Sequence, residues 1–266
     1  MLLLLVIILS LIFVHELGHY IVGRMCGVGI EEFSVGFGRK IFSFEAFGNK
    51  WSLGMIPLGG YVKFEGEQDY DNKIQNAKSF WAVHPLKRLV IALAGPATNL
   101  LIPYALFFFY FWGMPWPDVK APDGANVATV SAAWAWKGSV DTTHKMYYSI
   151  YKSVDIIKEK GVSHKDIGGP VAIYEITEQA RVRSVQTKDN GFLYQWIAFL
   201  SINLGLINLL PIPLLDGGHV VFSIAETAMG RKIKYKTRTW LSYVGIIFVF
   251  GIMALAITSD IGRLLG

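Results

Sequence analysis

The chain has 266 residues, of which 53% are hydrophobic and only 17% charged, and its mean hydropathy is +0.40. This composition is too apolar for an ordinary soluble domain and predicts a polytopic membrane protein. The net charge of +5 does not indicate nucleic-acid binding, because the basic residues lie around apolar segments and are not gathered on a polar one. The single cysteine, Cys26, excludes an intramolecular disulfide framework.

Four apolar segments are long enough to cross a bilayer, since a helix needs about 20 residues to span a hydrocarbon core of about 30 Å. They are residues 2–23, 88–112, 193–228 and 239–258. Pro211 and Pro213 interrupt the third. The first segment lacks a basic leading region and a small-residue cleavage site, so we interpret it as a retained helix and not as a signal peptide. We expect one membrane-embedded domain over residues 1–266.

The first apolar segment contains the string His15-Glu16-Leu17-Gly18-His19. In a helix the two histidines share one face, the geometry in which two imidazoles hold one Zn²⁺ and Glu16 stands beside the metal to act on a bound water. The same string also occurs by chance in proteins that bind no metal. A charged residue at the centre of a membrane helix costs about 2 to 3.5 kcal/mol, so this apolar setting favours the metal site.

The residues between the first two spans change their hydrophobic period. Residues 33–64 alternate between apolar and polar positions around a turn at Gly48-Asn49, which predicts a small β-hairpin sheet. Its many phenylalanines and glycines suit a sheet that enters the bilayer beside the helices. An ordinary cytoplasmic hairpin is the alternative.

Residues 113–190, between the second and third spans, form the predicted external segment. Apolar residues recur in it at helical spacing and predict an amphipathic helix on the membrane surface. They are Tyr147, Ile150, Tyr151, Val154 and Ile157.

A catalytic zinc site usually has three protein ligands and one open position, so a third ligand is needed. Asp216 is the strongest candidate, because it follows the proline break directly and is the one acid among the apolar residues of the later spans; Glu226 and Asp260 lie at the ends of theirs. A helix cap is its alternative role. His219 lies close enough to compete for the metal, and we expect it to cap or line the site.

The loop between the third and fourth spans sets the predicted orientation. It holds five basic residues and no acid: Arg231, Lys232, Lys234, Lys236 and Arg238. Such a loop is expected on the cytoplasmic side. With an even number of spans, both termini then lie outside and the end of the first span that carries His15 and His19 faces the cytoplasm.

Four motifs resemble the site-2 protease family, and in particular its bacterial regulator-of-sigma-E protease type. They are His15-Glu16-Leu17-Gly18-His19, Pro57-Leu58-Gly59-Gly60-Tyr61-Val62-Lys63, Gly95-Pro96-Ala97-Thr98-Asn99 and the stretch from Asn208 to His219. The resemblance covers nearly the whole chain. It implies Zn²⁺ held by His15, His19 and Asp216, with Glu16 as the catalytic carboxylate.

The same resemblance implies a membrane-reentrant hairpin that helps to position the substrate, with Gly59 and Gly60 in it, and substrate contacts from Asn208 and Asn203. The implied substrates are single-span membrane proteins, such as an anti-sigma factor or remnant signal peptides, in a bacterial inner membrane. Members of this branch usually carry PDZ domains after the second span. Residues 113–190 lack the alternating strands that such a domain needs.

The function predicted from these residues is hydrolysis of peptide bonds within transmembrane segments. Two other functions use the same residues: a membrane zinc transporter and a catalytically idle binding scaffold. A transporter has no need for a base beside the metal, so the presence of Glu16 favours the protease.

Overall fold

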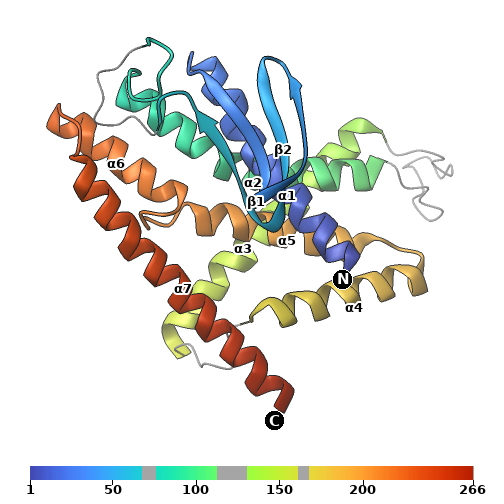
Figure 1. The fold of residues 1–266 in the computed structure, drawn as a ribbon. Coiled ribbons are helices and arrows are strands. Elements are labelled where there is room, and N and C mark those ends of the chain that lie inside the picture. The colour runs from blue at the N-terminus through green and yellow to red at the C-terminus, as the bar shows by residue number, and fades with distance from the viewer. Residues whose placement is uncertain (68–75, 113–130, 161–167, 266) are drawn as a thin grey trace. The chain divides into compact units, whose positions relative to one another are not determined.

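The computed structural model describes residues 1–67, 76–112, 131–160 and 168–265. These residues form seven helices and two strands. In chain order the elements are α1 (Leu2–Met25), β1 (Ile30–Ala46), β2 (Asn49–Phe64), α2 (Pro85–Trp112), α3 (Ala132–Lys160), α4 (Pro170–Thr187), α5 (Gly191–Asn208), α6 (Asp216–Met229) and α7 (Tyr235–Leu265) (Figure 1).

Four helices are long and apolar enough to cross a membrane: Leu2–Met25, Pro85–Trp112, Gly191–Asn208 and Tyr235–Arg263. This confirms the predicted polytopic helical architecture. The third predicted span is divided, because the prolines end α5 at Asn208 and α6 begins anew at Asp216. At 14 residues, α6 is too short to cross the hydrocarbon core by itself.

The chain forms two compact units. One combines Met1–Leu100 with Asn203–Ile252, and the other combines Leu101–Ile202 with Met253–Gly266. All of the sequence-predicted site residues belong to the first unit. The single domain expected over the whole chain stays a prediction.

In the first unit, β1 pairs antiparallel with β2 to form the predicted hairpin sheet, which begins three residues earlier than expected. Phe47 and Gly48 connect the strands, so the turn lies one residue earlier than the predicted Gly48-Asn49. Their positive φ angles of 55° and 75° are the backbone that a tight two-residue hairpin turn requires. The sheet lies against α1 (Figure 1). Phe33 is 1% exposed in the core between them and stacks on Trp51 with ring centroids 4.4 Å apart.

The far half of the hairpin presents apolar side chains outward. Ile41, Phe42, Phe44 and Phe47 are all exposed. Adjacent exposed aromatic and aliphatic side chains are costly in water and favourable in lipid. This exposure therefore favours a hairpin that enters the bilayer over a cytoplasmic one.

Polar side chains of the hairpin form hydrogen bonds with one another. Glu32 accepts hydrogen bonds from the hydroxyls of Ser52 (2.5 Å) and Tyr61 (2.9 Å), and Lys40 donates to Ser34 (2.7 Å) and Tyr61 (2.9 Å). Non-helical structure at membrane depth requires such internal pairing, because lipid offers no hydrogen bonds.

The second unit contains α3 and α4, which make up the described part of the predicted external segment. The predicted amphipathic stripe falls within α3. Asp260, near the end of α7, accepts backbone hydrogen bonds from Gly169 (3.1 Å) and Val171 (2.8 Å) and so caps the start of α4. Residues 113–130 and 161–167 of the predicted segment lie outside the described residues.

Candidate metal centre

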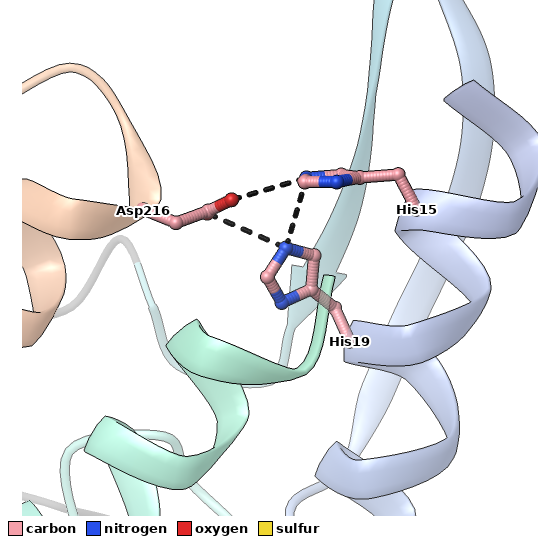
Figure 2. Close-up of side chains that lie close together, drawn as sticks. All are labelled: His15, His19 and Asp216. Carbon is pink, nitrogen blue, oxygen red and sulfur yellow. Dashed lines mark hydrogen bonds and ion pairs between the residues drawn. The ribbon is translucent and has the colours of Figure 1, made fainter. Parts of the chain in front are cut away.

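Two histidines from α1 and one aspartate from α6 converge in the first unit (Figure 2). His15 and His19 are both buried, and their Nε2 atoms lie 3.3 Å apart. The carboxylate of Asp216 lies 3.0 Å from Nε2 of His15 and 3.3 Å from Nε2 of His19. The helix supplies the first two groups because positions four residues apart share a face.

The spacing of these three groups fits one metal ion. Zinc binds imidazole nitrogen and carboxylate oxygen at about 2.0–2.2 Å in tetrahedral geometry, so two of its ligand atoms lie about 3.3–3.5 Å apart. Two of the observed separations, at 3.3 Å, reach this range, and the third, at 3.0 Å, is slightly shorter. Three ligands of this kind leave a fourth position open, as catalytic zinc sites do.

The other ring nitrogens of the two histidines are also held in place. Nδ1 of His19 lies 2.7 Å from the carbonyl oxygen of Ile91, and Nδ1 of His15 lies 3.1 Å from the side-chain amide of Asn99. A carbonyl fixes the proton on Nδ1, which leaves the Nε2 lone pair free for a metal. For the same result at His15, the amide oxygen of Asn99 must face the ring, since amide oxygen and nitrogen exchange places by a rotation.

Glycine allows helix α2 to approach both imidazoles. A Cβ atom on Gly95 would lie 2.8 Å from Nε2 of His15 and 2.7 Å from Cδ2 of His19, and closer still to Nε2 of His19. No side chain fits there without displacing a ring. Gly95 belongs to the second-span motif singled out in the sequence, and this contact gives that motif a steric role.

The position of Asp216 follows from the proline break. Added Cβ atoms on Gly217 and Gly218 would collide with the carbonyl oxygens of Leu209, Leu210 and Ile212. The two glycines therefore let α6 begin tight against the turn that follows α5. Leu215 is the N-cap residue of α6 and the helix has no side-chain cap. The carboxylate of Asp216 faces the imidazoles, which does not fit the alternative role as a cap.

The three residues border a cavity of about 180 Å³. Glu16 also lines the cavity and is 8% exposed. Strand β2 contributes Gly60, whose missing Cβ would lie 2.8 Å from Cγ of Glu16. His219 lines the cavity too, as expected from the sequence. The potential acid–base group and the potential ligands thus line the same cavity.

Of the residues predicted to contact the substrate, two lie at the metal centre or its cavity and two do not. Gly60 borders the cavity, and the amide of Asn208 lies 3.4 Å from Nε2 of His15. Gly59 faces the ring of Phe37 and does not line the cavity. Asn203 is half-buried on α5 and does not line it either.

Sequence reasoning did not assign several residues of this site. Asn99 appears in the sequence only as the last residue of the second-span motif, although a polar side chain in an apolar span is a usable signal. The carbonyl of Ile91 carries no side-chain signal at all. Glu67, in the turn after β2, lines the cavity without belonging to a recognised motif.

Comparison with known proteins agrees with this arrangement. The model of peptidase family M50 matches residues 3–252. Three similar proteins carry the name "Putative zinc metalloprotease". The one from Campylobacter jejuni is 28% identical over 98% of this chain and 92% of its own. Those from Agrobacterium fabrum and Helicobacter pylori are 26% and 28% identical, over 98% and 96% of this chain and 95% and 97% of theirs.

The alignment with the Campylobacter jejuni protein extends over 347 positions, which is more than the length of this chain. That protein therefore carries inserted segments with no counterpart here.

Proposed function

The chain belongs to peptidase family M50, the site-2 proteases, and is a zinc metalloprotease; on this premise we propose that it hydrolyses peptide bonds within or at the edge of the transmembrane segments of other membrane proteins. The observation that carries the proposal is the depth of the site. His15, Glu16 and His19 are buried in a helix apolar enough to span a membrane. His19 lies six residues before the end of α1, or about 9 Å along the helix axis.

The ligand set supports zinc as the metal. His15, His19 and Asp216 would hold it, and Ile91 and Asn99 would keep the two imidazoles in the orientation that binding needs. Bound Zn²⁺ supplies a Lewis acid for the scissile carbonyl and makes water more acidic.

Glu16 is the proposed general base and acid. Its carboxylate would take a proton from the attacking water and return it to the nitrogen of the leaving amine, so that the peptide bond breaks without releasing a free amide anion. Its burial restricts water around the reacting groups, and Gly60 leaves space for the side chain. A general base of this kind contributes about 10²- to 10⁴-fold to a rate.

The proposed substrate is a single-span membrane protein, such as an anti-sigma factor or a remnant signal peptide. A helical substrate keeps its carbonyl groups in hydrogen bonds and must unwind before cleavage. Residues 60–62 of β2 border the cavity, which supports binding of the unwound segment alongside the hairpin by strand addition. Asn208, next to His15, is placed to take up freed backbone groups of the substrate.

We further propose a bacterial inner membrane as the location, with the active site toward the cytoplasm and both termini outside. The five basic residues from Arg231 to Arg238, in the loop after α6 and the first turn of α7, support this orientation. The helical segment after the second span supports a form of the enzyme without PDZ domains.

The test is Glu16→Gln, which keeps the shape of the side chain and removes its basicity. The matched control is Glu175→Gln, an exposed position on α4. We expect Glu16→Gln to bind as much zinc as the original protein and to cleave a membrane-embedded reporter about 10²-fold more slowly or worse. The control should keep full activity. Cleavage by Glu16→Gln at the original rate would refute the role of Glu16, and zinc uptake into proteoliposomes without any cleavage would favour a transporter.

A further inference from the structure

A second cavity lies in the first unit, separate from the metal centre. It measures about 390 Å³ and is bordered by the residues that lead into α2, by the last turn of α6 and by the loop before α7. Its polar lining includes His84, Arg88, Glu226, Arg231 and Lys232. None of these side chains has a part in the proposed cleavage reaction.

Positive charge exceeds negative charge at this cavity. Among the described residues that line it, Glu226 is the only acid, whereas Arg88, Arg231 and Lys232 are basic. Both carboxylate oxygens of Glu226 already accept hydrogen bonds from the protein. The donors are Arg88 (2.7 Å), Arg238 (3.1 Å) and the backbone N–H of Ile233 (2.9 Å). One carboxylate thus serves two buried guanidinium groups, and among the described residues that line the cavity the basic side chains outnumber the acidic one.

Arg88 is paired with Glu226 through Nη2, but it keeps further N–H groups without a partner among the described residues. Its side chain is 2% exposed, and neither Nε nor Nη1 has a hydrogen-bond acceptor within the described part of the chain. The guanidinium lies over the ring of Trp81, 4.9 Å from its centroid, which holds it against the cavity wall. Buried donors without an acceptor are unusual in folded proteins and indicate that an anionic group belongs nearby.

Two exposed basic side chains line the same cavity as the buried Arg88. Arg231 and Lys232 both line the cavity and are accessible from outside. Nζ of Lys232 donates one hydrogen bond to the carbonyl of Trp81 (2.9 Å), which leaves donors for a ligand. Partial burial and the neighbouring Arg88 lower the pKa of Lys232, so an anion bound beside it would relieve the repulsion.

The location indicates which anion is available. The cavity lies where two candidate membrane spans begin, α2 at Pro85 and α7 at Tyr235. The ends of spans lie at the level of the lipid headgroups. The positive end of the α2 dipole also points to this region, and no acid occupies its first turn. Basic pockets at the cytoplasmic ends of membrane helices are suited to phosphorylated headgroups.

We propose that this cavity binds the phosphate group of an anionic phospholipid. Lys232 and Arg231 contact the phosphate oxygens, and Arg88 supplies the charge behind them. The bound lipid holds the beginning of α2. Because Ile91, Gly95 and Asn99 follow on the same helix, lipid binding also steadies the helix that supports the metal centre.

The experiment compares the full chain in nanodiscs of phosphatidylcholine alone with the full chain in nanodiscs that also contain phosphatidylglycerol. Bound lipid is counted by native mass spectrometry after detergent extraction, and thermal unfolding is followed in parallel. The test variant is Arg231→Ala with Lys232→Ala. The control variant is Lys234→Ala with Lys236→Ala, which removes the same charge from the end of the loop and the first turn of α7, at exposed positions that do not line the cavity.

We expect the original chain to retain phosphatidylglycerol and to unfold at a higher temperature in its presence. The test variant should lose about tenfold or more of this affinity, and the control should retain it. Equal losses in both variants would overturn the proposal, because they would show general attraction to a charged surface. Stabilisation by inorganic phosphate, with no effect of phosphatidylglycerol, would overturn the lipid assignment.

Discussion

Replacement of Gly95 by alanine tests the geometry of the metal centre most directly. The new Cβ would lie 2.7–2.8 Å from atoms of both imidazoles, whereas non-bonded carbon contacts are comfortable at about 3.5–4.0 Å. Either α2 or the rings must therefore move by about 1 Å. Metal sites tolerate deviations of only about 0.2 Å in ligand distance. We expect zinc affinity to fall about 100-fold, equivalent to about 2.7 kcal/mol of binding free energy.

The assay is zinc binding to the purified protein across a series of chelator-buffered free zinc concentrations, with bound metal measured by elemental analysis. Gly251→Ala on α7 is the matched control, because a Cβ there meets no other atom within 4 Å. Circular dichroism checks that both variants keep their helices. If Gly95→Ala binds zinc as tightly as the control does, then α2 does not lie against the imidazoles and the proposed centre is wrong.

Three further changes have separate readouts. Asn99→Ala should weaken zinc binding about 10- to 100-fold, since it removes the group that orients His15; unchanged binding in the same titration would exclude that role. The atoms nearest to a Cβ at position 60 belong to Glu16, Ser34 and Ile12, none of them a proposed metal ligand. In Gly60→Ala the rate of reporter cleavage should therefore fall while zinc content stays constant, and loss of zinc would contradict this. Burial raises the pKa of Glu67 from 4.5 to about 7. The folded chain therefore holds this proton more tightly than the unfolded chain, and the stability contributed by Glu67 is lost as pH rises through 7. Glu67→Gln should match the original protein well below pH 4.5 and exceed it by about 1–3 kcal/mol at pH 8; a difference in thermal unfolding that does not change with pH would refute this.

The membrane spans and the paired histidines could be predicted from sequence because they depend on residues that are close to one another along the chain. Hydrophobic runs and the four-residue spacing of His15 and His19 are local patterns, and helix geometry converts them directly into a membrane segment and a shared face. The hairpin was equally accessible through its period-two alternation and its turn. The third span was expected as one interrupted segment, and the proline signal did locate the interruption.

The position of the third metal ligand relative to the two histidines could not be predicted from local sequence patterns. Asp216 was selected by elimination among acids, but only the tertiary structure placed its carboxylate 3.0 Å from an imidazole about 200 residues earlier. Asn99 and the carbonyl of Ile91 became visible as partners of the histidines for the same reason, and Gly95 and Gly60 acquired their steric roles. The sequence by itself determined which residues are chemically able to bind metal and to move protons. Which of them meet was decided by packing between distant segments, because hydrogen bonds and van der Waals contacts act over a few ångströms in space and are not confined to neighbours along the chain.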